Sequence, residues 1–187
     1  GHCEEVEAIA SNLLADPEPT IAGMVATLLE WMDADRKATP LKALQGRIWK
    51  MGYEAGDLQG DAYPDAVAGL QRWRAAGLSL YVYSSGSVEA QKLIFGHNAY
   101  GDITPWFSGF FDTKIGGKLE AGSYTRIAVA IGLMPRSVLF LSDHPGEIAA
   151  AQRAGMQTVR LMRDDPVEAG AVASFADISI PKKATAS

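Results

Sequence analysis

One apolar run of the sequence ends in hydroxyl groups that could bind a phosphate. Residues 78–83 (LSLYVY) are followed by Ser84, Ser85 and Gly86 at an expected strand-to-helix turn. Two hydroxyls beside the free N–H groups of a helix start favour an anion such as phosphate. Plain helix capping by Ser85 or Ser87 accounts for the same residues. This segment alone therefore leaves phosphate binding and capping open.

A second apolar run ends in carboxylates that could bind a metal ion. Residues 138–141 (VLFL) are followed by Asp143 and, four residues later, by Glu147. Carboxylate oxygens at the end of a buried strand suit a hard divalent cation. Alternatively, Asp143 caps the next helix and Glu147 adds favourable charge to its first turn. His144 is expected to face solvent, because Mg²⁺ prefers oxygen ligands.

Between these two segments lies a single lysine in a glycine-containing loop. Lys118 directly follows Gly116 and Gly117. A lysine at such a position can reach a bound phosphate as a point charge, although a solvated loop lysine fits the local sequence as well. The order of the three segments along one region of the chain indicates a phosphate site more strongly than any one segment does.

The elements around these residues alternate between strand and helix. Strands that are apolar on both faces belong inside a parallel sheet covered by helices, and the alternation indicates a doubly wound, Rossmann-like α/β domain with helices on both faces. Ligands bind such sheets beyond the carboxyl ends of the strands, so Ser85, Lys118 and Asp143 are expected to meet at one edge. Strands are predicted over 78–86, 109–113, 137–143 and 156–163, and helices over 64–77, 87–98, 120–132 and 145–155.

The first sixty residues have a helical pattern and no strand signal. Apolar residues recur at intervals of three and four in 4–16, 20–37 and 39–53. Thr20 and Thr39 are predicted N-caps, with Pro40 at the first helical position. The expected parts are a small helical module over 1–60, an α/β core over 61–180 and a disordered tail over 181–187.

Composition excludes several classes of protein. The chain of 187 residues is 48% hydrophobic with a net charge of −5, which is unlike a disordered chain. It has no basic stripe for nucleic acid and no stretch of about 18 apolar residues for a membrane span. We expect no secretory leader, and the single Cys3 points to a reducing, cytoplasmic compartment.

Longer segments resemble a known family. The segment YSSGSVEAQKLIFGH (83–97), together with 37–53, 101–118 and 139–156, closely resembles the enolase-phosphatases of methionine salvage, within the haloacid dehalogenase-like hydrolases. The resemblance implies an α/β core with an inserted helical cap, most of which residues 1–60 would form. It also implies a Mg²⁺-dependent cytoplasmic hydrolase, monomeric when complete, that converts 2,3-diketo-5-methylthiopentyl 1-phosphate to the acireductone.

The resemblance also implies roles for particular residues. Ser84 and Ser85 would hold the phosphate or enolate oxygens, and Lys118 would neutralise the transferring phosphoryl group. Asp143 would bind Mg²⁺, and Glu147 would support the metal or order the loop. The implied catalytic residues are Lys118, Ser84 and Ser85, and the implied substrate contacts are Ser84, Ser85, Gly86, Lys118, Lys42 and Gln45.

The family's nucleophile has no counterpart in the sequence. The family uses an aspartate that ends a first, central strand in a D-x-E-G-T-T-like motif and forms an aspartyl-phosphate. The only Asp-x-Asp here, residues 33–35, lies in a helical pattern, so we reject it as the nucleophile. The sequence is therefore expected to begin inside the cap.

A missing central strand has a structural consequence. It would lie between the strands that end at Ser84 and Asp143, so both strands would keep unpaired edges. Such a chain is not expected to fold alone into the family structure. Two other functions stay open, namely a catalytically inactive phosphate-binding module of the same fold and another phosphohydrolase, such as a phosphoglycolate-type enzyme.

Overall fold

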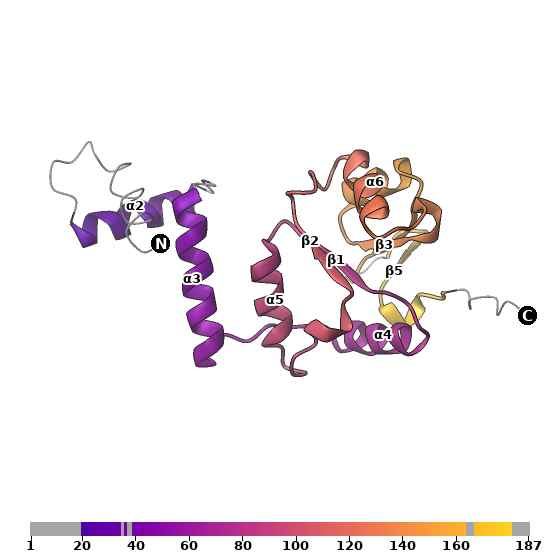
Figure 1. Cartoon of the computed structure of the whole chain (residues 1–187), viewed down its shortest axis with the longest axis horizontal. Coiled ribbons are helices and arrows are strands. Elements are labelled where there is room, and N and C mark those ends of the chain that lie inside the picture. Colours follow the sequence, from indigo (N-terminus) through magenta and orange to yellow (C-terminus); the bar gives the residue numbers. More distant parts are fainter. Residues whose placement is uncertain (1–19, 35, 37–38, 164–166, 181–187) are drawn as a thin grey trace, which may run out of the picture. The chain divides into compact units, whose positions relative to one another are not determined.

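The computed structural model describes residues 20–34, 36, 39–163 and 167–180 (Figure 1). The chain divides into two compact units, Gly1–Leu58 and Gln59–Ser187. The helix predicted over 4–16 and the tail predicted over 181–187 lie outside the described residues. No helix in the described part of the chain is long and apolar enough to cross a membrane.

The first unit contains two helices, α2 (Ile21–Asp33) and α3 (Thr39–Ala55). The cap prediction at Thr20 is confirmed, because its Oγ1 accepts a hydrogen bond of 3.1 Å from the N–H of Gly23. Helix α3 begins at Thr39 itself rather than at Pro40, a one-residue difference that is usual at helix ends. Asp33 is the last residue of α2, so its helical assignment holds.

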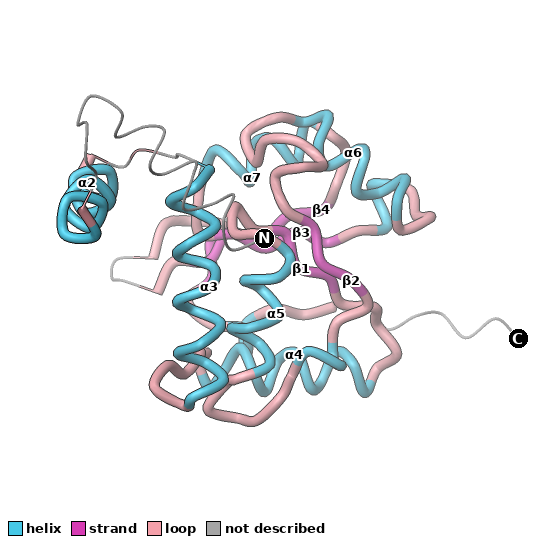
Figure 2. Tube along the Cα trace, turned by 60° about the vertical axis from the view of Figure 1, so that its left-hand side comes forward, coloured by secondary structure: helices cyan, strands magenta, loops and turns pink. Residues whose placement is uncertain are grey.

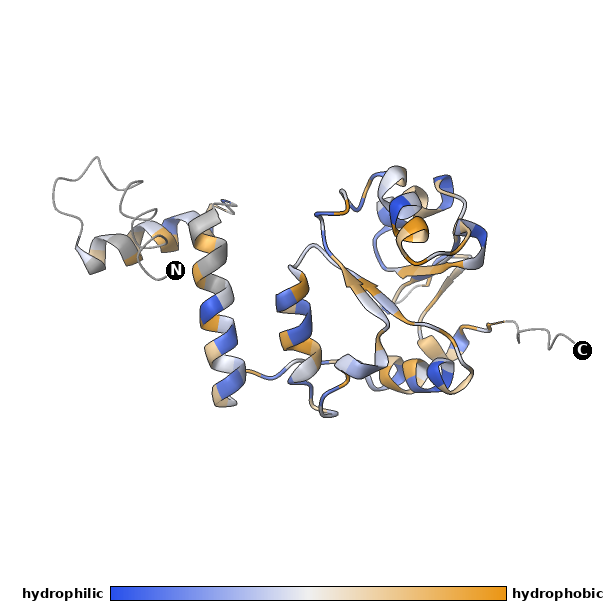
Figure 3. Ribbon diagram, in the orientation of Figure 1, coloured by the Kyte–Doolittle hydropathy of each residue, from blue (hydrophilic) through white to orange (hydrophobic). Residues whose placement is uncertain are grey.

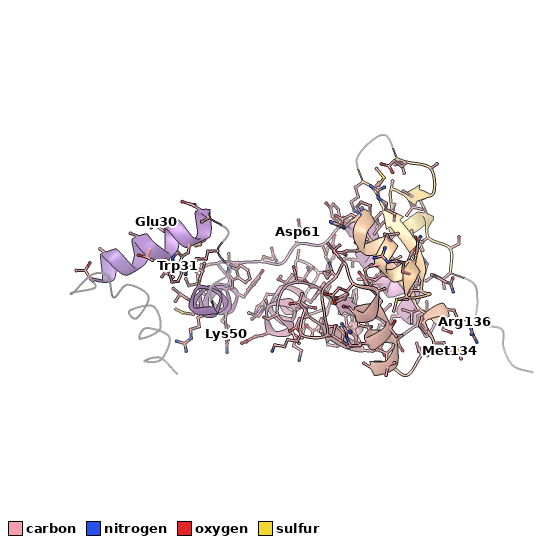
Figure 4. The ribbon with its side chains drawn as sticks, turned by 90° about the horizontal axis from the view of Figure 1, so that it is seen from above. Glu30, Trp31, Lys50, Asp61, Met134 and Arg136 are labelled. Atoms are coloured by element: carbon pink, nitrogen blue, oxygen red, sulfur yellow. The ribbon has the colours of Figure 1, made fainter. Side chains whose placement is uncertain are left out.

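An apolar contact joins these two helices. Leu28 and Trp31 of α2 are buried together with Leu41 of α3, and Leu44 packs against them (Figure 4 labels Trp31). Their spacing of three residues places them on one face of each helix, which is the amphipathic pattern expected from the sequence.

The second unit confirms the predicted α/β class. Its predicted helices and strands all form, although the strands are shorter than expected. The helices are α4 (Pro64–Ala75), α5 (Val88–Gly96), α6 (Ala121–Ala130) and α7 (Pro145–Arg153), the strands are β1 (Tyr81–Tyr83), β2 (Gly109–Phe111), β3 (Leu139–Ser142), β4 (Gln157–Leu161) and β5 (Ala171–Val172), and the 3₁₀ turns are η1 (Thr104–Trp106), η2 (Pro135–Ser137) and η3 (Phe175–Asp177).

The strands form two parallel sheets, with β1 beside β2 and β3 beside β4 and β5. Figure 2 shows α6 and α7 above the strands, α4 below them and α5 to their left, and Figure 3 shows hydrophobic colour along much of the strands. Among the described residues β1 pairs only with β2, and β3 pairs only with β4, so each of these two strands has one unpaired edge. The predicted open edges are therefore present.

The aromatic ring of Tyr124 on α6 contacts both sheets. Tyr124 is fully buried, and its ring lies 5.6 Å from that of Tyr83 on β1 and 4.9 Å from that of Phe140 on β3, in edge-to-face geometry. Such aromatic pairs add stability beyond the area that they bury. Small residues of α7, including Ala150 and Ala151, complete this core. The core therefore places the ends of β1 and β3 on either side of one aromatic side chain.

A carboxylate of α4 fastens the C-terminal segment to the same unit. Asp65 accepts hydrogen bonds from Arg163 (3.0 Å), from the Ser174 hydroxyl (2.9 Å) and from the Phe175 N–H (2.9 Å). Partial burial opposes ionisation, but these donors outweigh it and lower the pKa of Asp65 from 3.8 to about 2. The Trp73 ring stacks on Phe175 at 5.2 Å. These contacts hold the segment around η3 against α4.

Candidate phosphate site

A short charged contact joins the glycine loop to the first turn of α7. Lys118 Nζ lies 2.7 Å from Glu147 Oε1, and the two side chains are 24% and 11% exposed. The Ser142 hydroxyl donates to Glu147 Oε2 at 2.8 Å. Both carboxylate oxygens of Glu147 are therefore engaged, one by the ammonium group and one by the hydroxyl group.

Lys118 also lies beside the end of β1. Its Nζ is 5.9 Å from the centre of the Tyr83 ring, within the range of a cation–π contact. Tyr83 is the last residue of β1, directly before Ser84, and Ser142 is the last residue of β3, directly before Asp143. The structure thus brings the ends of β1 and β3 together around the loop lysine. The catalytic and binding roles of Ser84, Lys118 and Asp143 remain predictions.

Two hydrogen bonds of Ser84 hold the serine turn. The Ser84 N–H donates to the Phe111 carbonyl (3.1 Å), and the Ser84 Oγ accepts from the Gly86 N–H (3.1 Å). Helix α5 is capped by Ser87, whose Oγ accepts from the Ala90 N–H. Of the two proposed caps Ser87 is the right one, and Ser85 is exposed at the turn.

Two buried polar side chains support this turn, and the sequence reasoning missed both. Gln91 is 3% exposed, and its Nε2 donates to the carbonyls of Gly86 and Phe111, both at 2.9 Å. Its Oε1 is buried without a hydrogen-bond partner in the described part of the chain. Asp112 is 7% exposed and accepts from the N–H groups of Val88 and Lys114. The available signals were a glutamine on the buried face of a helix and an aspartate directly after a strand.

The residue that caps α7 is His144, so the alternative that Asp143 is the cap is wrong. His144 Nδ1 accepts from the N–H groups of Gly146 (3.1 Å) and Glu147 (3.4 Å). His144 is exposed, as expected, but it is hydrogen-bonded rather than merely solvated. Its ring occupies the capping position because Pro145 starts the helix one residue later than the Asp143 alternative requires. Asp143 itself is exposed.

The residues present fit a Mg²⁺ ion only in part. No group of three or more His, Cys, Asp or Glu side chains gathers among the described residues. Mg²⁺ is commonly held by one or two carboxylates together with water and substrate phosphate. The exposed Asp143 carboxylate fits that role. The contacts of Glu147 favour the other predicted alternative, in which it orders the Lys118 loop.

Lys42 and Gln45 belong to α3, and their side chains are outside the described part of the structure, so their substrate contacts stay predictions. A cleft of about 460 Å³ opens at the start of α5 and is lined by Ser87, Asp112 and Lys114, among others. Lys118 does not line it, so we do not assign this cleft to the phosphate.

Comparison with known proteins agrees with the fold. Residues 4–155 match the haloacid dehalogenase-like hydrolases, which defines the class. The chain is 57% identical to enolase-phosphatase E1 of Pseudomonas fluorescens, covering 86% of this chain and 70% of that protein. It is also 57% identical to enolase-phosphatase E1 of Pseudomonas aeruginosa, covering 96% and 83%. The chain therefore belongs to the enolase-phosphatase E1 family and is a phosphatase by that membership.

A solved structure extends the comparison to three dimensions. The crystal structure of the UTR4 protein (unknown transcript 4 protein) of Saccharomyces cerevisiae is 35% identical, with a TM-score of 0.73. The match covers 88% of this chain and 75% of that one. A haloacid dehalogenase-like phosphatase from Thermococcus onnurineus, at 15% identity and a TM-score of 0.60, shares the fold.

Proposed function

We propose that this chain serves the Mg²⁺-dependent conversion of 2,3-diketo-5-methylthiopentyl 1-phosphate to the acireductone in methionine salvage. The observation that carries the proposal is Lys118. Its ammonium group is held 2.7 Å from Glu147, between the ends of β1 and β3. Family membership adds the reaction class, and the substrate is our inference from the resemblance.

Each residue of the cluster has a definite task in this proposal. Lys118 balances the negative charge of the phosphoryl group during transfer, where electrostatic stabilisation supplies most of the catalysis. The hydroxyls of Ser84 and Ser85 bind phosphate or enolate oxygens beside the Gly86 backbone. When bound, Mg²⁺ supplies Lewis-acid polarisation of a substrate oxygen, and Asp143 would hold it.

Glu147 sets the resting state of this site. Its carboxylate holds the ammonium group of Lys118 and accepts from Ser142. A phosphate that binds Lys118 must therefore share the ammonium group with Glu147 or displace it. In this proposal Glu147 keeps Lys118 pointed at the strand ends while no anion is bound.

The described residues do not supply the nucleophile of the proposed reaction. The resemblance implies an aspartate on a strand that pairs with both β1 and β3, and neither strand has a partner on that side within the described ranges. Asp112 follows β2, but its two oxygens accept from backbone N–H groups. These observations favour a second candidate function, a phosphate-binding module of the same fold without turnover.

Phosphate release from competing substrates tests the proposal. The chain is given the diketone phosphate and phosphoglycolate together, with and without Mg²⁺, and inorganic phosphate binding is measured in parallel. With the nucleophile-bearing strand present, we expect Mg²⁺-dependent release from the diketone phosphate, lowered about 100-fold or more by Lys118→Ala. Lys114→Ala, a change in the same loop, is the matched control and should keep full activity.

Two results would point elsewhere. Equal or better turnover of phosphoglycolate would assign the chain to a different phosphohydrolase activity. Phosphate binding that depends on Lys118, with no release from either substrate, would support the binding module.

A further inference from the structure

We propose that three side-chain hydroxyls position Lys118 by holding the backbone of its loop, an inference that rests on the proposed phosphate role of Lys118. Three successive carbonyl oxygens of the loop each accept a hydrogen bond from a different hydroxyl. We call the three donors, Tyr83, Ser123 and Tyr124, the hydroxyl clamp. The pairs are Tyr83 to Gly116 at 2.7 Å, Ser123 to Gly117 at 2.8 Å and Tyr124 to Lys118 at 2.6 Å.

The clamp is buried, which makes it hard to break. Ser123 and Tyr124 are 0% exposed, and Tyr83 is half-buried. The three hydrogen bonds are partly buried, so a carbonyl that loses its donor has only limited access to water. Burial also raises the pKa of the Tyr83 and Tyr124 hydroxyls, so both keep their protons as donors near neutral pH. The loop therefore has little freedom to leave its observed path.

The donors come from two different elements that both contact this loop. Tyr83 ends β1, whereas Ser123 and Tyr124 lie in the first turn of α6. Gly116 has a φ of +137°, and a side chain there would collide with Ser123 and Arg126. Gly116 is thus needed because it lets Ser123 and Arg126 pack closely against the loop, and not because it makes the loop mobile. The loop is fixed between β1 and α6.

The clamp acts on the direction in which Lys118 points. The Lys118 carbonyl is held by Tyr124, and its Nζ lies 5.9 Å from the ring of Tyr83 and 2.7 Å from Glu147. Lysine has a long flexible stem, so a fixed backbone removes one source of disorder before the ammonium group meets an anion. Tyr83, Ser123 and Tyr124 are positioning residues in this scheme, because they act on phosphate through Lys118.

The test removes one hydroxyl and measures Lys118 directly. Tyr124→Phe keeps the ring contacts with Tyr83 and Phe140 but removes the donor to the Lys118 carbonyl. Tyr81→Phe, the same chemical change on β1, is the matched control because Tyr81 lies at the surface. The rate at which an amine-directed reagent modifies Lys118 is followed by peptide mass spectrometry. Inorganic phosphate affinity and the melting temperature are measured on the same samples.

We expect Tyr124→Phe to raise the modification rate of Lys118 about threefold or more and to weaken phosphate binding about fivefold or more, with no change for Tyr81→Phe. A lower melting temperature with an unchanged Lys118 rate and phosphate affinity would reduce the clamp to a purely structural role and overturn the proposal. Ser123→Ala, a smaller change in the same clamp, decides the question if Tyr124→Phe does not fold.

Failure of the proposed function would look different. In that case phosphate would bind equally well to the unmodified chain and to Lys118→Ala. The Lys118 modification rate needs no ligand, so it still reports whether the clamp directs the lysine.

Discussion

Replacing Glu147 by glutamine should have two effects of opposite sign. Glu147→Gln keeps the size of the side chain and an acceptor for Ser142, but it removes the negative charge beside Lys118. The chain should become less stable, because an ammonium group loses its counter-ion in a largely buried place. It should also bind inorganic phosphate more tightly, because the anion no longer competes with a carboxylate.

The stability loss follows from the geometry of the pair. At 2.7 Å and an effective dielectric constant of about 20, the attraction is roughly 6 kcal/mol before the cost of desolvation is subtracted. Removing one partner of a fully buried pair costs about 3–5 kcal/mol. Lys118 keeps 24% of its side-chain exposure and can regain some water. We therefore expect a loss of about 2 kcal/mol, or about 4–8 °C in melting temperature for a chain of this size.

The gain in phosphate affinity follows from the same contact. A phosphate oxygen in contact with the Lys118 ammonium group lies within about 6 Å of the Glu147 carboxylate, and unit charges at that distance repel by about 0.7 kcal/mol even in a water-like dielectric. A phosphate with a charge of about −1.5 would gain roughly 1 kcal/mol when that repulsion is removed. This corresponds to about fivefold tighter binding.

The assay combines calorimetric titration of inorganic phosphate with thermal unfolding of the same samples. The gain in affinity should shrink at high salt, where charges are screened. Glu120→Gln is the matched control: its side chain is 67% exposed and 3.8 Å from Arg126, and such surface pairs contribute little. Weaker phosphate binding by Glu147→Gln, or an unchanged melting temperature, would show that Glu147 does not compete for Lys118.

Three further predictions concern the supports of the site. The lowered pKa of Asp65 means that its stabilisation is present above about pH 4 and is lost as the pH falls toward 2, and Asp65→Asn should remove that dependence in urea unfolding. Gln91→Leu leaves the Gly86 carbonyl without its donor and the Phe111 carbonyl with the Ser84 N–H alone, and it should cost about 1–3 kcal/mol in urea unfolding and speed hydrogen exchange at Gly86; unchanged exchange would exclude a role in holding the turn. Asp143→Asn should weaken Mg²⁺ dependence and turnover together, and an unchanged Mg²⁺ titration would refute the ligand role.

The elements of the α/β unit were predictable because their signals are local. The apolar runs before Ser84 and Asp143 form β1 and β3, and the amphipathic segments between the strands form helices. Strand lengths were overestimated because an apolar run does not show where pairing stops. Strand β5 (Ala171–Val172) was missed because two residues are too few to display a period.

The site was predictable in outline, but the cap of α7 and the partner of Lys118 were not. Chain order placed Lys118 and the ends of β1 and β3 at one edge, and the contacts to Tyr83 and Glu147 agree with that placement. The cap of α7 could not be assigned, because aspartate is the commoner capping residue and His144 takes the position instead. The pairing of Glu147 with Lys118 spans 29 residues of sequence and leaves no local pattern.

The hydroxyl clamp was beyond sequence reasoning for a different reason. Tyr83 and Tyr124 occupy positions where an apolar pattern predicts core residues, and their rings are indeed in the core. Their hydroxyls bind backbone carbonyls, a group that every residue carries, so no residue type marks the acceptor. The glycines before Lys118 are compatible with a mobile loop and with a tightly held one. Only the hydroxyl donors to the loop distinguish these cases. Here they hold the backbone of the Gly-Gly-Lys segment and so position the Lys118 ammonium group.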